Sequence, residues 1–243
     1  MKKISFETFL GVLLLAGLLL LSTKGVERFK NQNSYTMARD TAAEQENVQF
    51  SHTVVVDAGH GGTDPGKVGI NDALEKDINL AIAQKLKSCL EKENIRVVMT
   101  REDGNGLYKE SDSNQKQADM RARCEIIDGA NADLTVSVHQ NSYTAESVSG
   151  PQVFYHAQSK EGERAARCLQ DALNTGLEIT RPREIKANNT YYILKKTKTP
   201  VVIAECGFLS NSAEAAKLVT EKYQQQVAEA LTEGILNFLK EAS

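Results

Sequence analysis

The chain has 243 residues, of which 41% are hydrophobic, and a formal net charge of −3 at neutral pH. This apolar content is enough for the core of one domain of ordinary size, and we find neither an internal repeat nor a second domain. The nearly neutral charge, without a dense basic patch, argues against a nucleic-acid partner. Tryptophan is absent and aromatic residues are few, so no stacking platform for bases or sugars is expected.

The N-terminus has the layout of an export signal. Lys2 and Lys3 precede residues 9–21, a run without charged or polar side chains. This run is shorter than the ~20 residues that a spanning helix needs, and no clear cleavage site follows it. A buried core helix is less favoured, because the flanking lysines and the uniform leucine content are typical of a signal. We expect an exported chain with three parts: a signal peptide or membrane anchor at residues 1–23, a polar linker at 24–51 and a catalytic domain at 52–243.

Four cysteines, an even number, would permit disulfide bonds in an exported protein. They are spread widely, and three lie on apolar faces of expected helices: Cys89, Cys124, Cys168 and Cys206 are the full set. No C-x-x-C pair exists, so a thiolate zinc site is not expected. Free thiols are favoured, and disulfide bonds stay an alternative.

Strand and helix patterns alternate along the domain, beginning with a β-branched run at residues 53–56. Further strands are expected at residues 95–100, 134–138, 152–155 and 201–204, a strand or hairpin edge at 191–194, and helices at 78–90, 118–129, 165–173 and 223–239. This alternation predicts a single α/β domain with a mostly parallel twisted sheet, flanked by helices on both faces. In such sheets, functional sites form just beyond the carboxyl ends of the strands.

Three of the buried strands end in a histidine or a glutamate. His60 follows the first strand, and His139 and Glu205 follow two later ones. Glu75 belongs to the first turn of the first helix, close in sequence to the end of the first strand. If the strands are neighbours in one sheet, these four side chains converge on one edge.

Two imidazoles and one carboxylate form a common catalytic zinc shell, in which the fourth position is left to water. His60, Glu75 and His139 could supply this shell, and Glu205 could act as general base and then as acid toward the leaving amine. Taken singly, the three ligands have structural alternatives: a turn residue, a helix cap and a hydrogen-bonded core histidine. Glu205 is harder to explain structurally, because a carboxylate after four apolar residues is costly to bury. The residues alone predict a metal site but no substrate.

Around these residues the sequence resembles a known family, the zinc-dependent N-acetylmuramoyl-L-alanine amidases called amidase-3. The matching stretches, in the family's order, are VVVDAGHGGTDPG (54–66), ALEKDINLAIA (73–83), MTRED (99–103), RARCEII (121–127), SVHQNS (137–142) and AECGFLSN (204–211). The resemblance implies that His60, Glu75 and His139 bind Zn²⁺, and that Glu205 is the catalytic glutamate. It also implies hydrolysis of the amide between N-acetylmuramic acid and the L-alanine of the peptidoglycan stem peptide.

A closer resemblance is to the germination-specific amidases of endospore formers. It is carried by SGPQVFYH (149–156), by IKANNTYYILKKTKTPVVIAECGFLSN (185–211) and by the compact, tethered layout. This resemblance implies a role in the spore cortex, where removal of the stem peptide precedes muramic-δ-lactam formation. The expected location is extracytoplasmic, in the cell wall or the forespore intermembrane space, with N-terminal membrane association and an activating or targeting protein partner as further expectations.

Some amidases of this family carry a long inhibitory helix after the second histidine ligand. Here only a short segment separates His139 from the strand expected near Pro151, so no built-in plug is expected. Control would then come from expression, from access to the substrate or from a partner protein.

Several polar residues near the expected ligands have less defined roles. Asn141 is a candidate substrate-binding residue, and with Gln140 it could instead fix the orientation of the neighbouring histidine. Arg101 is expected in a structural ion pair. Lys186 and Asn188 are expected to be structural, with lining of the substrate groove as the alternative.

Two other classes of function are weighed against the amidase. A thiol hydrolase could use Cys206 as nucleophile and His139 as base, whereas a serine esterase lacks its G-x-S-x-G motif. A non-catalytic peptidoglycan-binding or regulatory protein could also be built on an amidase fold. The complete set of four site residues argues against this last alternative.

Overall fold

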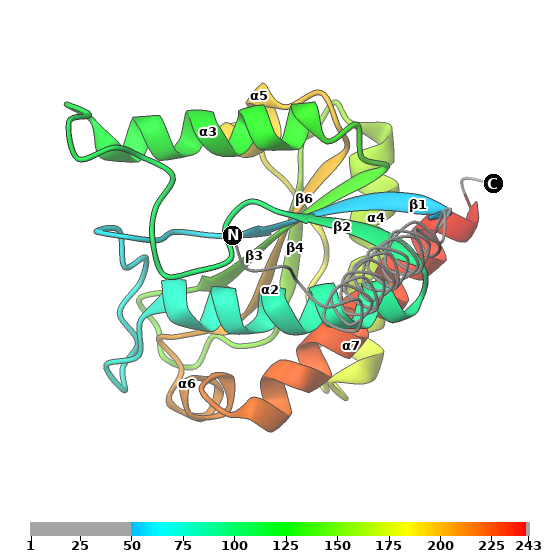
Figure 1. The fold of residues 1–243 in the computed structure, drawn as a ribbon. Helices are drawn as coiled ribbons and strands as arrows, with labels where there is room; N and C mark the ends of the chain where they lie inside the picture. Colours follow the sequence, from blue (N-terminus) through cyan, green and yellow to red (C-terminus); the bar gives the residue numbers. More distant parts are fainter. Residues whose placement is uncertain (1–49, 242–243) are drawn as a thin grey trace, which may run out of the picture. The chain divides into compact units, whose positions relative to one another are not determined.

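The computed structural model describes residues 50–241 (Figure 1). The expected signal or anchor at 1–23 lies outside the described residues, as does nearly all of the linker at 24–51. Within residues 50–241, no helix combines the length and hydropathy that crossing a bilayer requires.

The described residues form alternating strands and helices around one sheet. In chain order, the elements are β1 (His52–Ala58), α2 (Glu75–Lys92), β2 (Ile95–Met99), α3 (Gln115–Gly129), β3 (Leu134–Asn141), β4 (Gln152–Tyr155), α4 (Lys160–Gly176), β5 (Lys186–Ala187), α5 (Tyr192–Lys196), β6 (Val201–Phe208), α6 (Ser212–Leu218) and α7 (Glu221–Glu241). The sheet has six strands in the order β2-β1-β3-β6-β4-β5. The first four strands of this order are parallel, whereas β4 runs antiparallel to β6 and β5 follows the direction of β4. The prediction of a mostly parallel α/β domain is confirmed.

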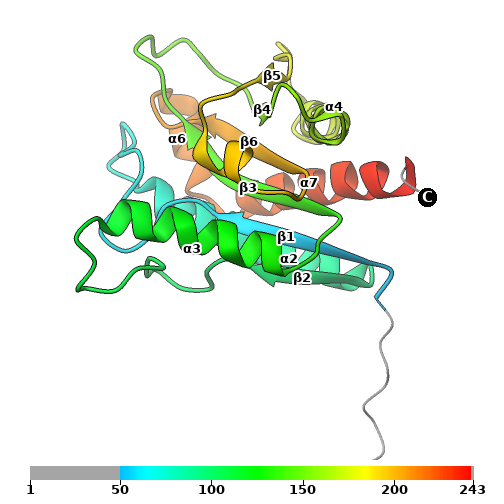
Figure 2. The same ribbon diagram turned by 90° about the horizontal axis from the view of Figure 1, so that it is seen from above.

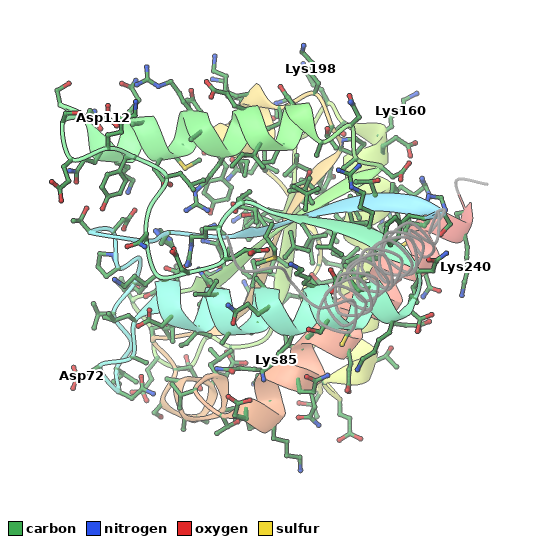
Figure 3. The ribbon with its side chains drawn as sticks, viewed as in Figure 1. Asp72, Lys85, Asp112, Lys160, Lys198 and Lys240 are labelled. Carbon is green, nitrogen blue, oxygen red and sulfur yellow. The ribbon has the colours of Figure 1, made fainter. Side chains whose placement is uncertain are left out.

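Helices cover both faces of the sheet, as Figure 2 shows. The larger core lies between the sheet and helices α2, α4, α6 and α7, whereas α3 and α5 pack on the opposite face. Val54 and Val56 of β1 belong to the larger core and Val55 to the smaller one, as the alternation of side chains along a strand requires. Because both faces are covered, the central strands are continuous apolar runs. Charged side chains such as Lys160 and Lys198 extend outward from the layers (Figure 3).

One expected element has a different structure. The prediction of a strand or hairpin edge at residues 191–194 is wrong, because Tyr192–Lys196 form the short helix α5. Asn188 precedes it and accepts hydrogen bonds from two following backbone N–H groups, at 2.7 and 2.9 Å. Ile193 and Leu194 are both buried, after two exposed tyrosines. Two adjacent buried residues fit a helical turn, whereas a strand would alternate its buried and exposed positions.

A buried arginine joins α3 to the end of β1. Arg123 Nη1 donates to Asp57 Oδ1 at 2.7 Å, and Arg123 Nε donates to Asp119 Oδ2 at 2.6 Å. Thr100 and Ser137 donate their hydroxyl groups to the same Asp57 carboxylate. Burial alone would raise the pKa of Asp57, but attraction to Arg123 and these two hydrogen bonds lower it to about 2. The charges of Arg123 and Asp57 must neutralise each other inside the protein, because Arg123 is only 1% exposed to water.

Replacing Arg123 with methionine should lower the free energy of unfolding by about 3–5 kcal/mol, because Asp57 would be left buried without its cation. Urea unfolding followed by circular dichroism measures this loss. Arg121 lies on the same helix but is exposed, so Arg121→Met should change the unfolding free energy by less than about 0.5 kcal/mol. Similar small losses in both variants would contradict a structural role for the buried pair.

Candidate functional site

The four expected site residues lie at the carboxyl edge of the parallel strands. His60 follows β1, Glu75 is the first residue of α2, and His139 and Glu205 lie near the ends of β3 and β6. His139 and Glu205 are direct partners in the register of these two strands. The strand order therefore brings together residues that are up to 145 positions apart in the sequence.

His60, Glu75 and His139 form a group that could hold a metal ion, because one potential ligand atom from each lies within 4.8 Å of the others. Glu75 Oε1 lies 3.2 Å from His60 Nε2 and 2.9 Å from His139 Nδ1. Ligands at about 2.0–2.1 Å from a tetrahedral zinc ion lie about 3.3 Å from one another. The donor types and these two distances therefore fit such an ion.

The backbone around the two histidines is tightly constrained. His60 has a φ of 62°, a conformation uncommon for residues other than glycine. Its Nδ1 lies 3.1 Å from Asp64 Oδ2, which leaves Nε2 to face Glu75. The ring of His139 packs against Gly59, where an added Cβ would come within 2.3 Å of ring atoms. A glycine is therefore required beside the second imidazole.

Glu75 is an anion in this setting. Burial would raise its pKa, but hydrogen bonds and attraction from His139 and His60 lower the pKa far below its ordinary value. Burial would lower the pKa of His139, but the contact with Glu75 raises it above its ordinary value. Metal ligands must be deprotonated, and Glu75 meets this condition across the ordinary pH range.

Glu205 is a carboxylate of the opposite kind. It is only 8% exposed, and its Oε2 has no hydrogen-bond partner within the described part of the chain. Burial raises the pKa of Glu205 to about 7, while attraction to His139 opposes the shift and repulsion from Glu75 adds to it. A pKa near neutral pH suits a group that accepts and then returns a proton.

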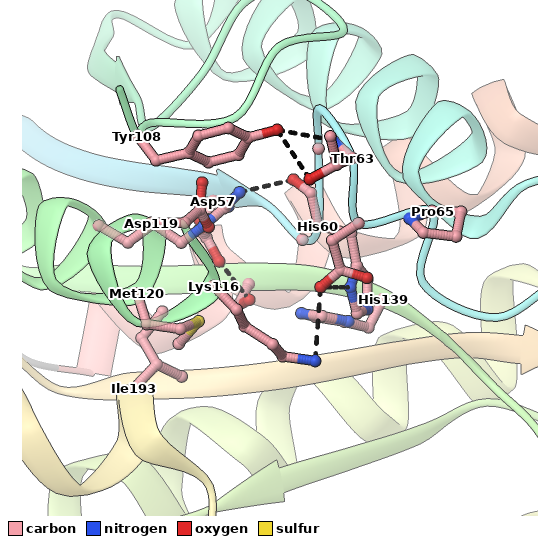
Figure 4. Close-up of a pocket in the computed structure, with 15 residues that line it drawn as sticks. Asp57, His60, Thr63, Pro65, Tyr108, Lys116, Asp119, Met120, His139 and Ile193 are labelled. Carbon is pink, nitrogen blue, oxygen red and sulfur yellow. Dashed lines mark hydrogen bonds and ion pairs between the residues drawn. The ribbon is translucent and has the colours of Figure 1, made fainter. Parts of the chain in front are cut away.

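A cavity of about 340 Å³ opens beside the two histidines, between α3 and the loop that follows β1 (Figure 4). His60 and His139 line one part of it, and Tyr108, Lys116 and Met120 line another. The site thus has room for a substrate next to the candidate metal ligands. Between β3 and β4, residues 142–151 contain no helix, so the structure has no plug at this position.

The other polar candidates make contacts within the protein. Asn141 Oδ1 accepts a hydrogen bond from the backbone N–H of Ser142, at 2.8 Å. Gln140 donates its backbone N–H to Glu75 Oε1, at 3.2 Å. In place of the expected ion pair, Arg101 donates to backbone carbonyl oxygens, including that of Ala58 at 2.9 Å. These contacts support the loops at the edge of the sheet.

The two remaining groove candidates are placed at β5 and α5. Lys186 is exposed on β5, and its ammonium group lies 5.8 Å from the centre of the Phe154 ring. Asn188 is half-buried, and its side chain organises the turn before α5. These contacts lie within the protein, and a role of either residue in lining the substrate groove stays a prediction.

Three residues near the site were not found from the sequence. Asn79 lies four positions after Glu75, a spacing that could have marked it as a neighbour one helical turn away. Asp64 lies four positions after His60 in a loop, where this spacing gives no such signal. Tyr191 packs edge to face against Phe154, with ring centres 5.6 Å apart. Burial raises the pKa of Tyr191, and repulsion from Glu205 adds to the shift, so the phenol lies within electrostatic range of the site.

The thiol alternative finds no support in the geometry. All four cysteines are free, and Cys206 is fully buried on the strand that carries Glu205. Burial raises the pKa of the Cys206 thiol far above its usual range. Only a thiolate is an effective nucleophile, so this cysteine is inert at neutral pH.

Comparisons with known proteins agree with this geometry. A family model described as N-acetylmuramoyl-L-alanine amidase matches residues 54–237. The germination-specific N-acetylmuramoyl-L-alanine amidase of Bacillus subtilis (strain 168) is 37% identical over 191 residues, which cover 77% of this chain and 80% of that protein. The amidase LytC of the same organism is 29% identical over 210 residues, which cover 86% of this chain and 40% of LytC.

Solved structures give the same result. The CwlD amidase from Clostridioides difficile, solved in complex with the GerS lipoprotein, is 37% identical with a TM-score of 0.76, over 79% of this chain and 100% of that one. An N-acetylmuramoyl-L-alanine amidase from Clostridium difficile 630 is 32% identical with a TM-score of 0.70, over 79% and 98% of the two chains. The chain therefore belongs to the N-acetylmuramoyl-L-alanine amidase family.

Proposed function

We propose that this amidase binds a zinc ion through His60, Glu75 and His139 and uses Glu205 to transfer protons. One observation carries the proposal: three donor atoms lie within 4.8 Å of one another, beside a buried carboxylate that has a free oxygen atom. Two neutral imidazoles and one anionic carboxylate are a ligand set that zinc hydrolases use.

The reaction is hydrolysis of the amide that joins the lactyl group of N-acetylmuramic acid to L-alanine. When bound, zinc would supply Lewis acidity toward the carbonyl oxygen and the attacking water. Glu205 takes a proton from the water as its oxygen attacks the carbonyl carbon. The C–N bond then breaks, and Glu205 returns the proton to the nitrogen of L-alanine. The products are a carboxylic acid on the sugar and a stem peptide with a free amino terminus.

The spore cortex is the proposed setting of this reaction. A relative that is 37% identical over most of both chains is named as germination-specific, which supports this role, with removal of the peptide preceding muramic-δ-lactam formation. A structural neighbour was solved in complex with a lipoprotein, which supports a protein partner for this chain as well. Asn141, which is half-buried at the end of β3, is proposed to contact the substrate.

The division of the chain fits an enzyme that is tethered in an extracytoplasmic compartment. Residues 1–23 are proposed as a signal or anchor, 24–51 as a linker and 52–243 as the catalytic domain. His52, the first residue of β1, lies at the opposite end of this strand from the site. Seven strand residues separate these two ends by roughly 20 Å.

Digestion of purified peptidoglycan by the zinc-loaded chain tests the activity and its carboxylate. The parent should release stem peptides with an L-alanine amino terminus, more from cortex than from vegetative wall, as measured by mass spectrometry. Glu205→Gln should lower the rate by about 10²–10⁴-fold while it retains zinc, because only the proton transfer is removed.

The matched variant Glu75→Gln should lose both zinc and activity, because it removes the anionic ligand. Cleavage by Glu205→Gln at the parent's rate would reject the proposed base. Peptidoglycan that is bound but left uncut by the zinc-loaded parent would favour the non-catalytic alternative.

The metal-free protein should become less stable as the pH rises from about 4.5 to about 7. Glu205 has a pKa of about 7 in the folded state and an ordinary value of 4.5 when exposed, so the folded state binds the extra proton across this window. Glu205→Gln removes the effect. In the presence of a chelator, this variant should match the parent near pH 4.5 and exceed its unfolding free energy by up to about 3 kcal/mol at pH 8. A constant difference between the two proteins over this range of pH would contradict the raised pKa.

A further inference from the structure

Asn79 lies at the centre of the site, yet neither the metal nor the proton transfer requires it as a reacting group. It is on α2, one helical turn after Glu75, and its side chain is fully buried. A buried amide needs hydrogen-bond partners, since an unsatisfied polar group is costly. The partners of Asn79 show what it does.

The Asn79 side chain makes three hydrogen bonds. Its Nδ2 donates to Glu75 Oε1 at 3.3 Å and to the carbonyl oxygen of Gly59 at 3.1 Å. Its Oδ1 accepts from Gln140 Nε2 at 3.2 Å. Gly59 directly precedes His60, and Gln140 directly follows His139. The Asn79 side chain therefore contacts the Glu75 carboxylate, the backbone next to His60 and the side chain next to His139.

The orientation of Glu75 depends on several N–H groups around its carboxylate. Its Oε2 accepts from the backbone N–H of Lys67 at 2.7 Å, and its Oε1 accepts from the backbone N–H of Gln140 at 3.2 Å. Besides the two imidazoles, Asn79 donates a side-chain hydrogen bond to Oε1, the oxygen atom that faces both rings. Loss of this donor would let the carboxylate rotate away from the histidines.

We propose that Asn79 is a positioning residue that holds the three candidate metal ligands in register with one another. The inference rests on the proposed zinc site and adds a residue that is not one of the three candidate ligands. Groups that orient metal ligands typically account for 10–100-fold in metal affinity. Gln140 acts in the same arrangement through its side-chain bond to Asn79.

Zinc affinity of the full chain, measured by competition with a chromogenic chelator, tests this role. Asn79→Leu should weaken zinc binding by about 10–100-fold. Gln140→Met keeps the backbone donor to Glu75 and loses the side-chain bond to Asn79, so it should weaken binding by a smaller factor. The double variant should bind zinc about as weakly as Asn79→Leu alone, because residues that act through one another are not additive.

Gln170 provides a matched control. It is a buried amide on α4, only 3% exposed, and it bonds to the backbone of β4 rather than to the site. Gln170→Met should lower the free energy of unfolding and leave zinc affinity unchanged. The same behaviour in Asn79→Leu would overturn the inference, because it would show a purely structural role.

Two further outcomes are decisive. If Asn79→Leu does not fold, the affinity of Gln140→Met carries the test, and a value equal to that of the parent would overturn the inference. If the parent itself binds no zinc, the proposed metal site is rejected, and the inference is rejected with it. Zinc bound by the parent and lost with Asn79 supports both.

Discussion

The buried pair of Arg123 and Asp57 is the constraint on which the site depends. It fixes the end of β1, and Arg123 also donates to the carbonyl oxygens of Ala58 and His60. Arg123 comes from α3 on one face of the sheet, whereas Glu75 comes from α2 on the other. The loop that carries His60 is therefore held between helices of both layers. Its unusual backbone conformation persists because the surrounding structure over-determines it.

Two glutamates at one edge of the sheet acquire opposite properties from their surroundings. Glu75 faces two imidazoles and accepts hydrogen bonds from several N–H groups. Its pKa therefore falls, and it is suited to bind a cation. Glu205 is buried with an unpartnered oxygen atom, so its pKa rises to about 7. Because the protein shifts the pKa values of these two groups in opposite directions, Glu75 is the candidate metal ligand and Glu205 the candidate proton carrier. The chemistry thus follows from burial and hydrogen bonding.

The sequence predicts the central strands because both faces of the sheet are covered, which makes each strand a continuous apolar run with a polar residue at its end. His60, His139 and Glu205 were found in this way. Helix α5 was mistaken for a strand, and α6 and β5 were not expected, because such short elements show no periodicity. The sequence of β4 also gives no local sign that this strand runs antiparallel to β6. The Arg123–Asp57 pair spans 66 positions, and only the folded chain brings its members together.

Hydrogen bonds within the protein hold the candidate ligands in place. Glu75 is held by hydrogen bonds from the loop, from β3 and from Asn79. His60 contacts Asp64, and the ring of His139 packs against Gly59. In small zinc domains, by contrast, the binding free energy of the metal is the folding free energy. Here a core on both faces of the sheet already supports the fold. The protein's own hydrogen bonds orient the candidate ligands, so we expect the affinity for the ion to depend on how well residues such as Asn79 preserve that orientation.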